Sequence, residues 1–242
     1  MAQLDSVLIT GANRGLGLAF VRELLLLKPH HLIACCRDPE TAEELQKLKK
    51  ENANLHVLQL DVANFDQYDE FVKLVQHILD QTGLQLIINN AGTYHRNTLD
   101  QVRPEIMIEE FRVNVAAPVE LTRLLWPLLK QWSVRSGGRK ATVANISSER
   151  GSLALNVTGG RYSYASSKAA LNQVTRSLAV DLQPEAQAMA LHPGWVKTDM
   201  GGPNAEITAD QSIPKIVKLL TGQLNIELNG KFLNYDGLPM PW

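Results

Sequence analysis

The sequence contains only two cysteines, Cys35 and Cys36, and they are adjacent. Neighbouring cysteines on an expected buried strand cannot staple distant parts of the fold together, so a reducing compartment, the cytoplasm, is expected. The six histidines lack the spacing of metal ligands, and no cluster of cysteine and histidine is present. The sequence therefore predicts neither a disulfide framework nor a metal site.

Long apolar runs and long runs of charge are also missing. No stretch approaches the length of a bilayer span, and the first residues lack the basic and apolar regions of a signal peptide. A formal net charge of −1 provides no attraction to nucleic acid or to an anionic membrane. We therefore expect no nucleic acid and no membrane as partners. Without linkers, repeats or low-complexity segments, residues 1–242 are expected to form a single domain.

What the chain does contain is a regular alternation of short apolar runs and longer helical patterns. Strands are expected at residues 4–10, 31–36, 55–60, 85–89, 141–146, 186–191 and 231–234, and helices at 16–27, 40–51, 65–81, 105–132, 162–181 and 209–221. This alternation predicts an α/β fold, a Rossmann-type doubly wound parallel sheet with helices on both faces. Ligands of such sheets bind beyond the carboxyl ends of the strands. One edge should therefore gather the polar residues Asn13, Arg14, Arg37, Asp61, Asn90, Ser147, Ser148, Pro193 and Gly194.

A glycine-rich turn, TGANRGLG at residues 10–17, joins the first expected strand to the first expected helix. Such a turn leaves backbone N–H groups uncovered at a helix start, where the helix dipole favours a phosphate. Its three glycines allow a tight turn, close approach to a pyrophosphate and close packing of the helix on the sheet. Glycine also serves plain turns and helix caps. The direct interpretation is a dinucleotide site formed by Gly11, Asn13, Arg14, Gly15, Leu16 and Gly17.

Arg37 ends the second expected strand, twenty residues after Gly17. A carboxylate near this position binds the ribose 2′-hydroxyl of NAD, whereas an arginine accommodates the 2′-phosphate of NADP. Arg14 could reach the same phosphate. The acidic neighbour, Asp38, precedes Pro39, which is typical of an N-cap followed by proline at the first helical position. Asp38 then has a structural role, and the sequence favours NADP(H).

Tyr164 and Lys168 lie four residues apart in an expected helix, which places them side by side on one face. A reductase must deliver a proton to the carbonyl oxygen as hydride reaches the carbon. Tyrosine has a pKa of about 10, which is too high for efficient acid catalysis near neutral pH. A neighbouring cation lowers such a pKa by about 1–3 units, so Lys168 is expected to lower the pKa of Tyr164. The alternative is a solvated helix face without chemistry.

Together these motifs resemble the short-chain dehydrogenase/reductase family, whose opening pattern is TGxxxGxG. The resemblance spans residues 7–237, and TGANRGLG, CRDP and LNYDG are most similar to carbonyl reductases of the sniffer type and to C-factor-like proteins. It implies NADPH-dependent reduction of aldehydes, ketones or quinones, with Tyr164 as proton donor and Lys168 also holding the ribose hydroxyls. The alternatives are an NADP-binding signalling or redox-sensing protein with little turnover, and an epimerase or dehydratase, whose TGxxGxxG turn and larger C-terminal domain are missing.

The resemblance also implies roles at the other strand ends. Ser148 would orient the substrate oxygen, with Ser147 as its rival, and Asn114 would hold a water that connects the lysine to solvent, unless it is an exposed helical asparagine. The adenosine and ribose pocket would be lined by Asp61, Val62, Asn90, Ala91 and Gly92, and the nicotinamide amide would be held by Pro193, Gly194, Val196 and Thr198. Asp61 also suits a helix cap, and the NNAG run suits a simple turn.

The segment that follows Thr198 is short, which predicts an open substrate site with loose selectivity. Candidate walls of this site are Tyr94, His95, Leu153 and Trp195, for each of which core packing or ordinary surface is an alternative. The gap between Ser148 and Tyr164 is slightly longer than in many family members but far too short for a large insertion. The family's homodimer, formed through the helices expected at 105–132 and 162–181, is therefore expected here.

Overall fold

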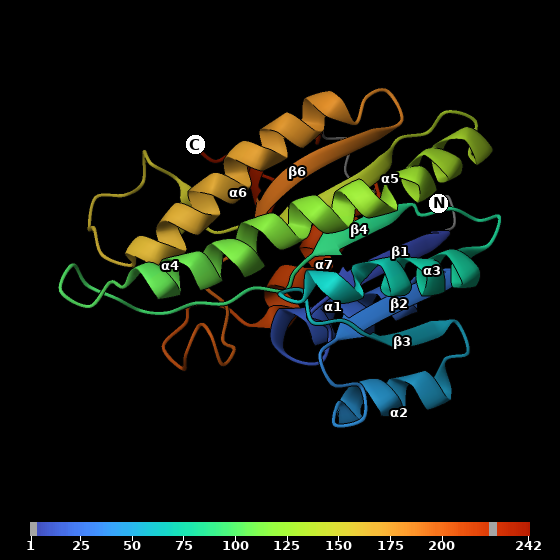
Figure 1. Cartoon of the computed structure of the whole chain (residues 1–242), viewed down its shortest axis with the longest axis horizontal. Helices are drawn as coiled ribbons and strands as arrows, with labels where there is room; N and C mark the ends of the chain where they lie inside the picture. The colour runs from blue at the N-terminus through green and yellow to red at the C-terminus, as the bar shows by residue number, and fades with distance from the viewer. Residues whose placement is uncertain (1–3, 223–226) are drawn as a thin grey trace.

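Seven parallel strands form one sheet in the order β3-β2-β1-β4-β5-β6-β7, with helices on both faces (Figure 1). The computed structural model describes residues 4–222 and 227–242. The strands are β1 (Ser6–Thr10), β2 (His31–Cys36), β3 (Leu55–Gln59), β4 (Leu86–Asn89), β5 (Ala141–Ile146), β6 (Ala186–His192) and β7 (Phe232–Asn234). The helices are α1 (Gly15–Leu26), α2 (Glu43–Glu51), α3 (Tyr68–Leu79), α4 (Pro104–Phe111), α5 (Ala117–Arg135), α6 (Tyr162–Asp181) and α7 (Ala209–Leu220), with short turns η1 (Phe65–Gln67), η2 (Arg112–Ala116) and η3 (Glu149–Gly151). The predicted α/β fold is confirmed.

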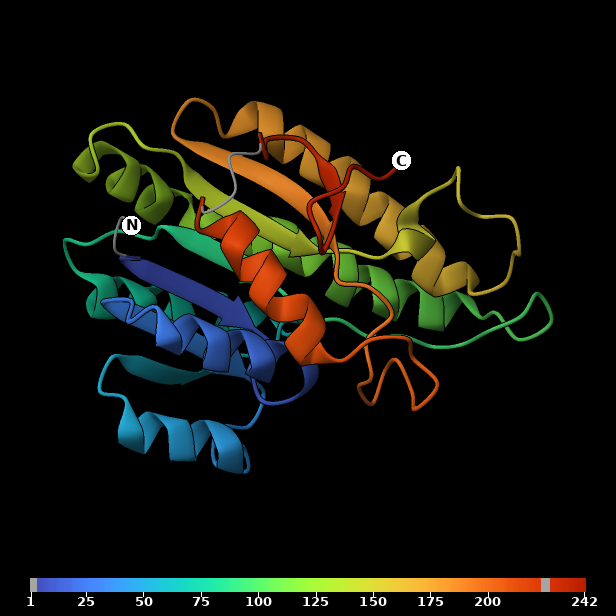
Figure 2. The same cartoon turned by 180° about the vertical axis from the view of Figure 1, so that it is seen from behind.

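The sheet separates two apolar cores. Helices α3, α5 and α6 cover the face seen in Figure 1, and α1 and α7 cover the face seen in Figure 2. Within β1, Val7 and Ile9 enter the core under α1 and α7, whereas Leu8 enters the core under α3 and α5. Because both faces are covered, every residue of β1 is buried, which explains the near-continuous apolar strands of the sequence.

A buried polar chain fixes α6 on the sheet. Asn89 at the end of β4 donates its side-chain amide to Asn145 Oδ1 in β5 (2.8 Å), and Asn145 donates to Thr175 Oγ1 in α6 (2.8 Å). All three side chains are buried and hydrogen-bonded. A buried amide without partners costs about 1–3 kcal/mol, so this chain favours one placement of α6 over others. The same helix carries Tyr164 and Lys168.

Two expected helices differ from the observed ones. The helix expected at 105–132 is interrupted, because the π-helical turn η2 inserts between α4 and α5. The helix expected from residue 40 begins at Glu43, because Asp38 Oδ1 accepts the N–H groups of Glu40 (3.1 Å) and Thr41 (3.3 Å) and forms a separate turn. Asp38 therefore caps this turn and not α2, and Pro39 lies outside the helix.

The connection before β4 provides a stability test. Gly83 has a φ of +71°, and a Cβ there would lie 2.4 Å from the Trp132 backbone nitrogen. Gly137 has a φ of +78°, and a Cβ there would meet nothing within 4 Å. Both alanine substitutions impose the same backbone strain, but only Gly83→Ala forces α5 away from the sheet. We expect Gly83→Ala to lower the free energy of unfolding by about 1–3 kcal/mol more than Gly137→Ala in urea denaturation. Equal losses of unfolding free energy in the two variants would show that Trp132 moves aside without cost.

Candidate active site

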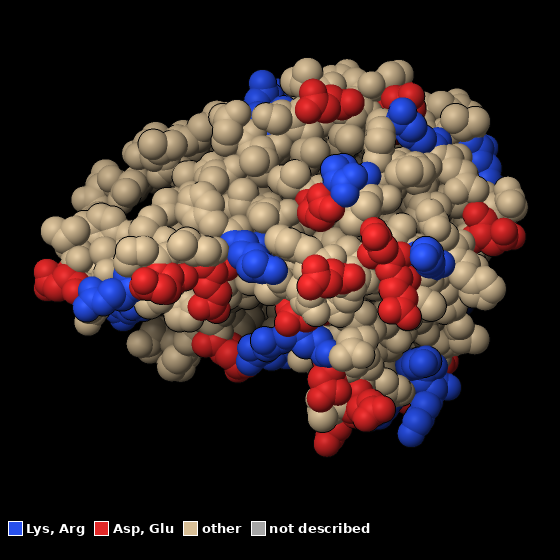
Figure 3. Space-filling view, viewed as in Figure 1, with Lys and Arg blue, Asp and Glu red and all other residues tan. Residues whose placement is uncertain are grey.

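The carboxyl ends of strands β1 to β6 open onto one cleft of about 1040 Å³. It is lined by all of the residues that the sequence assigned to the cofactor, namely Gly11, Asn13, Arg14, Gly15, Leu16, Gly17, Arg37, Asp61, Val62, Asn90, Ala91, Gly92, Tyr164, Lys168, Pro193, Gly194, Val196 and Thr198. Ser148 also lines it, whereas Asn114 is buried outside the lining. The surface in Figure 3 is hollowed below α4, and charges of both signs surround the hollow.

The glycine-rich turn lies against the end of β4 at the point where the strand order reverses. A Cβ on Gly17 would lie 2.0 Å from the Gly11 carbonyl oxygen, so α1 approaches the turn more closely than alanine allows. Asn90 donates its side-chain amide to the carbonyls of Thr10 (2.9 Å) and Gly11 (3.1 Å), and Thr10 Oγ1 accepts the N–H groups of Asn90 and Ala91. The NNAG run is therefore more than a turn, because Asn90 holds the glycine turn in place.

The end of β2 presents Arg37 to the cleft. One carboxylate oxygen of its acidic neighbour, Asp38, accepts the two N–H groups of the turn described above. Arg14 does not stand free, because its guanidinium forms an exposed ion pair with Asp199 at 2.7 Å. Such a surface pair contributes only about 0–1 kcal/mol and exchanges readily for a stronger anion. Asp61 Oδ1 accepts the N–H of Ala63 (3.0 Å), so Asp61 caps its loop and lines the cleft at the same time.

The two serines at the end of β5 point to different partners. Ser147 donates its hydroxyl to Asn172 Oδ1 in α6 (2.6 Å) and is buried. The hydroxyl of Ser148 is hydrogen-bonded to Tyr164 and accepts the N–H of Arg150 (3.2 Å). Ser148 and Tyr164 thus place two hydroxyl groups together at the cleft wall. A carbonyl oxygen placed between them could accept a hydrogen bond from each.

The predicted effect of Lys168 on Tyr164 is wrong for the protein alone. Burial raises the pKa of Tyr164 to about 12, and the hydrogen bond with Ser148 opposes this only in part. Lys168 Nζ lies 5.7 Å from the centre of the Tyr164 ring and donates to the Ile146 carbonyl oxygen (2.8 Å). Burial also lowers the pKa of Lys168 to about 8, opposed by the charge of Glu110. Loss of water around each group is the largest cause of its shift.

Asn114 is a buried residue of η2, so the alternative of an exposed helical asparagine is wrong. Its amide donates to the Thr93 carbonyl (3.0 Å) and to Ser167 Oγ (2.9 Å), and its oxygen accepts the Thr93 N–H (2.9 Å). Asn114 therefore ties the loop after β4 to α6 beside Lys168. π-Helical turns are frequent at functional sites, and this one aims Asn114 at both segments.

Glu110 is a buried acidic residue near Tyr164 that was not predicted from the sequence. Glu110 in α4 is fully buried; its Oε1 accepts the N–H of His95 and lies 3.0 Å from His95 Nδ1, whereas its Oε2 has no hydrogen-bond partner among the described residues. Burial raises the pKa of Glu110 above the usual range. The available signal was its position four residues before Asn114, on the same helix face.

A buried histidine was missed as well. His192 lines the cleft, and its Nδ1 accepts the N–H of Glu149 (3.2 Å). Burial lowers the pKa of His192, so the neutral ring is favoured. Its position at the end of β6 could have identified it as a cleft residue, because that strand end was expected at the same edge of the sheet.

Two of the four expected substrate walls line the cleft. Tyr94 and Trp195 do so, whereas the ring of His95 is bound to Glu110 and Leu153 is 77% exposed outside the lining. The segment after Thr198 contributes residues 199–204 to the cleft and is held by a hydrogen bond from Trp195 Nε1 to the Gly201 carbonyl (2.8 Å). One short segment thus borders this side of the cleft.

Among residues 4–222 and 227–242 no helix is both long and apolar enough to cross a membrane. The same part of the chain has no group of three His, Cys, Asp or Glu side chains arranged to hold a metal ion.

The burial of Lys168 predicts a pH-dependent stability. Its pKa is about 8 in the folded protein, below the ordinary value of 10.5, so the unfolded chain binds more protons between these pH values. The free energy of unfolding therefore rises with pH in this window, by about 3 kcal/mol. In Lys168→Met this contribution is absent, so the free energy of unfolding of wild type minus that of the variant should rise by that amount from pH 8 to 10.5. Denaturant titrations measure it, with the exposed Lys73→Met as control. A constant difference would contradict the assignment.

Known proteins resemble this chain in sequence and in structure. The sequence profile of the family described as short chain dehydrogenase matches residues 5–208. The carbonyl reductase Sniffer of D. melanogaster is 40% identical, with a TM-score of 0.95 over 99% of this chain and 100% of that one. An NADPH-bound carbonyl reductase from chicken fatty liver is 39% identical, with a TM-score of 0.93 over 100% of both chains. The C-signal protein of Myxococcus xanthus is 40% identical over 161 residues, which are 66% of this chain and 93% of that protein.

Proposed function

The chain belongs to the short-chain dehydrogenase/reductase family, and on that premise we propose that it reduces carbonyl compounds with NADPH. The observation that carries the proposal is the meeting of three groups in the cleft: the hydroxyls of Ser148 and Tyr164 and the amine of Lys168 lie at the same cleft as the glycine turn. The similarity to two carbonyl reductases, one of them named as NADPH-bound, supports it. Aldehydes, quinones and reactive ketones are the proposed substrates, because the segment that follows Thr198 and borders the cleft, residues 199–204, is short.

The residues of the chain suit a dinucleotide with an adenosine 2′-phosphate. Gly11, Gly15 and Gly17 line the cleft and would let a pyrophosphate approach the backbone, and Arg37 would bind the 2′-phosphate, with Arg14 able to leave Asp199 for it. Lys168 would hold the ribose hydroxyls. NADPH supplies the hydride when it is bound.

The protonation states suit a reduction. With a pKa of about 12, Tyr164 carries its proton at neutral pH and can donate it to the substrate oxygen as charge develops there. Ser148 donates a second hydrogen bond to that oxygen and orients it. Lys168, with a pKa of about 8, is mostly an ammonium ion at neutral pH and stabilises the tyrosinate that remains. Asn114 acts as a positioning residue through Thr93 and Ser167.

Substitution of the hydroxyl groups tests these roles. Tyr164→Phe should lower kcat/KM for an aldehyde and for a quinone by a factor of about 10²–10⁴, because it removes the proton donor. Ser148→Ala should lower kcat/KM by about 10²-fold or more, as loss of one donor to a developing oxyanion does. The matched control is Ser147→Ala, which removes a hydroxyl that faces Asn172 and should change kcat/KM only a few-fold. A larger loss in Ser147→Ala than in Ser148→Ala would reverse the assignment of the two serines.

The coenzyme preference is tested at the end of β2. Arg37→Asp should raise KM for NADPH by about ten- to a hundredfold, since a hydrogen bond to a charged group contributes about 1.5–3 kcal/mol. KM for NADH should fall or stay unchanged, because the new carboxylate can accept the ribose 2′-hydroxyl. Steady-state kinetics with both coenzymes measure the change, and Arg135→Asp, the same substitution at the exposed end of α5, is the control for the change of charge. Equal effects on both coenzymes would refute a 2′-phosphate contact.

The similarity to the C-signal protein supports a second candidate, an NADP-binding signalling protein with little turnover. A panel of aldehydes, ketones and quinones with purified wild type separates the two, because a reductase turns over members of the panel and Tyr164→Phe abolishes this. Binding of NADPH without turnover would favour the signalling candidate. The cytoplasmic location and the homodimer stay predictions from the sequence.

A further inference from the structure

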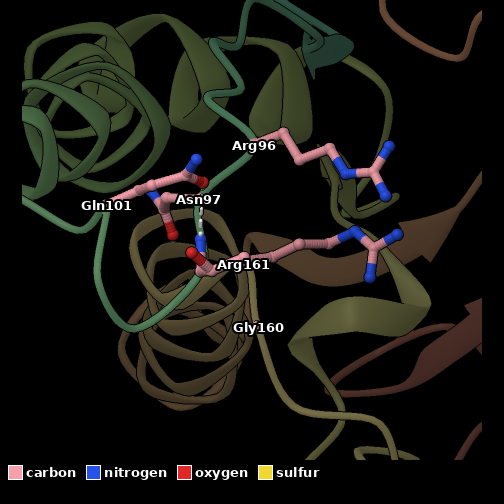
Figure 4. Close-up of a pocket in the computed structure, with 6 residues that line it drawn as sticks. Arg96, Asn97, Gln101, Gly160 and Arg161 are labelled. Atoms are coloured by element: carbon pink, nitrogen blue, oxygen red, sulfur yellow. Dashed lines mark hydrogen bonds between the residues drawn. The ribbon is translucent and has the colours of Figure 1, made fainter.

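A smaller pocket of about 390 Å³ adjoins the substrate side of the cleft. It is lined by Arg96, Asn97, Thr98, Gln101, Gly160 and Arg161. Arg96 and Arg161 line both this pocket and the main cleft. In Figure 4 their side chains run in the same direction from the wall of the pocket. Like charges that line one cleft repel unless an anion or water screens them.

Neither guanidinium is neutralised by the protein. Across residues 4–222 and 227–242, no carboxylate lies within 4.0 Å of Arg96 or Arg161. The acidic side chains of the cleft are Asp61, Glu109, Glu149 and Asp199; Glu149 lies beside Arg150 (3.8 Å) and Asp199 beside Arg14 (2.7 Å). The substrate side therefore presents two arginines whose charge is available to a ligand.

Arg161 is held in place by contacts that leave part of its guanidinium free. Its backbone is left-handed (φ +53°), its N–H donates to the Asn97 carbonyl (2.7 Å) and its Nε donates to the Tyr94 hydroxyl (3.2 Å). The Tyr94 ring packs edge-on against the Tyr164 ring, with centroids 4.8 Å apart. Arg161 is thus separated from Tyr164 by a single side chain. Its terminal nitrogens have no hydrogen-bond partner among the described residues and can form a bidentate contact with a planar anion.

The start of α6 adds to the positive potential around these two arginines. Arg161 occupies the N-cap position, where no side chain caps the helix, and the first turn contains no acidic residue. The positive end of the helix dipole therefore faces the same region as the two arginines.

We infer that Arg96 and Arg161 bind a carboxylate on the substrate, so that the preferred substrates are carbonyl compounds that also carry an acid group. The inference rests on the proposed reductase function, which puts the carbonyl at Ser148 and Tyr164. The coenzyme phosphates would be bound elsewhere, by the glycine turn and Arg37. The carboxylate lies beyond Tyr94, away from the reacting carbon, and takes part in binding and orientation only.

Matched substrates test the inference. Wild type is assayed with 3- and 4-formylbenzoate and with their methyl esters, which keep the aldehyde and ring but lack the charge. We expect kcat/KM for the better of the two acids to exceed that for its ester by about tenfold or more, as a charged hydrogen bond allows. Added salt should reduce this advantage, since it screens exposed charges. In Arg96→Gln, which changes no hydrogen bond of the protein, the advantage should fall several-fold, and in Arg96→Gln/Arg161→Gln it should vanish while KM for NADPH stays unchanged.

Controls separate the possible failures. Arg135→Gln removes a distant positive charge and should preserve the acid's advantage, and thermal melting verifies that all variants are folded. Equal losses for acid and ester, or an acid without advantage in wild type, would overturn the inference while leaving the reductase function intact. If wild type reduces no aldehyde, the reductase function fails. Calorimetric titration with terephthalate, which has the carboxylates but no reducible carbonyl, then decides the anion site: binding lost in the double variant supports it, and no binding overturns it.

Discussion

The close approach of Gly17 to the Gly11 carbonyl is the constraint on which the rest of the site depends. A side chain at residue 17 would collide with that oxygen, so the helix can start against the turn only with glycine. Asn90 completes the contact by holding the carbonyls of Thr10 and Gly11 from the neighbouring strand. The turn is thereby fixed between β1 and β4, where the strand order reverses and the cleft opens. The first N–H groups of α1 have no partner within their own helix, so they stay available at the turn.

Burial imposes a cost at the reacting groups. The low-dielectric surroundings that raise the pKa of Tyr164 to about 12 also lower the pKa of Lys168 to about 8. Both shifts disfavour the charged forms that the proposed reduction would use, and the protein opposes them with few groups: the Ser148 hydroxyl at Tyr164 and the Glu110 carboxylate near Lys168. A site arranged for stability alone would replace Lys168 with an apolar residue, so the buried ammonium is consistent with selection for chemistry.

The strands and most of the cleft could be predicted from the sequence, because apolar runs mark the strands and the residues that follow each strand mark the edge of the sheet. Apolar runs located all seven strands, and the polar residues that follow strands β1 to β6 do meet at one cleft, since parallel strands end at the same edge. The failures have local causes. The π-helical turn at Asn114 breaks no hydrophobic pattern, Asp38 caps a turn that ends before α2 begins, and Glu110 reads as an ordinary surface charge of an amphipathic helix. The sign of the Tyr164 pKa shift was wrong because spacing reveals a neighbouring cation but not the loss of water around both groups.

Glu110 explains how a buried ammonium and a pair of uncompensated arginines can lie near one tyrosine. It is fully buried and hydrogen-bonded to His95 through one carboxylate oxygen, so its position is fixed while its charge still acts on Lys168 and Tyr164. A carboxylate within ion-pair distance of Arg96 or Arg161 would occupy these arginines, and no described carboxylate lies so close. Glu110, in the core, supports the ammonium form of Lys168 without lining the cleft. The chain thus places the negative charge that acts on Lys168 in the core and leaves two arginines unpaired at the cleft, an arrangement that surface charge alone, which is mixed on the face seen in Figure 3, would not reveal.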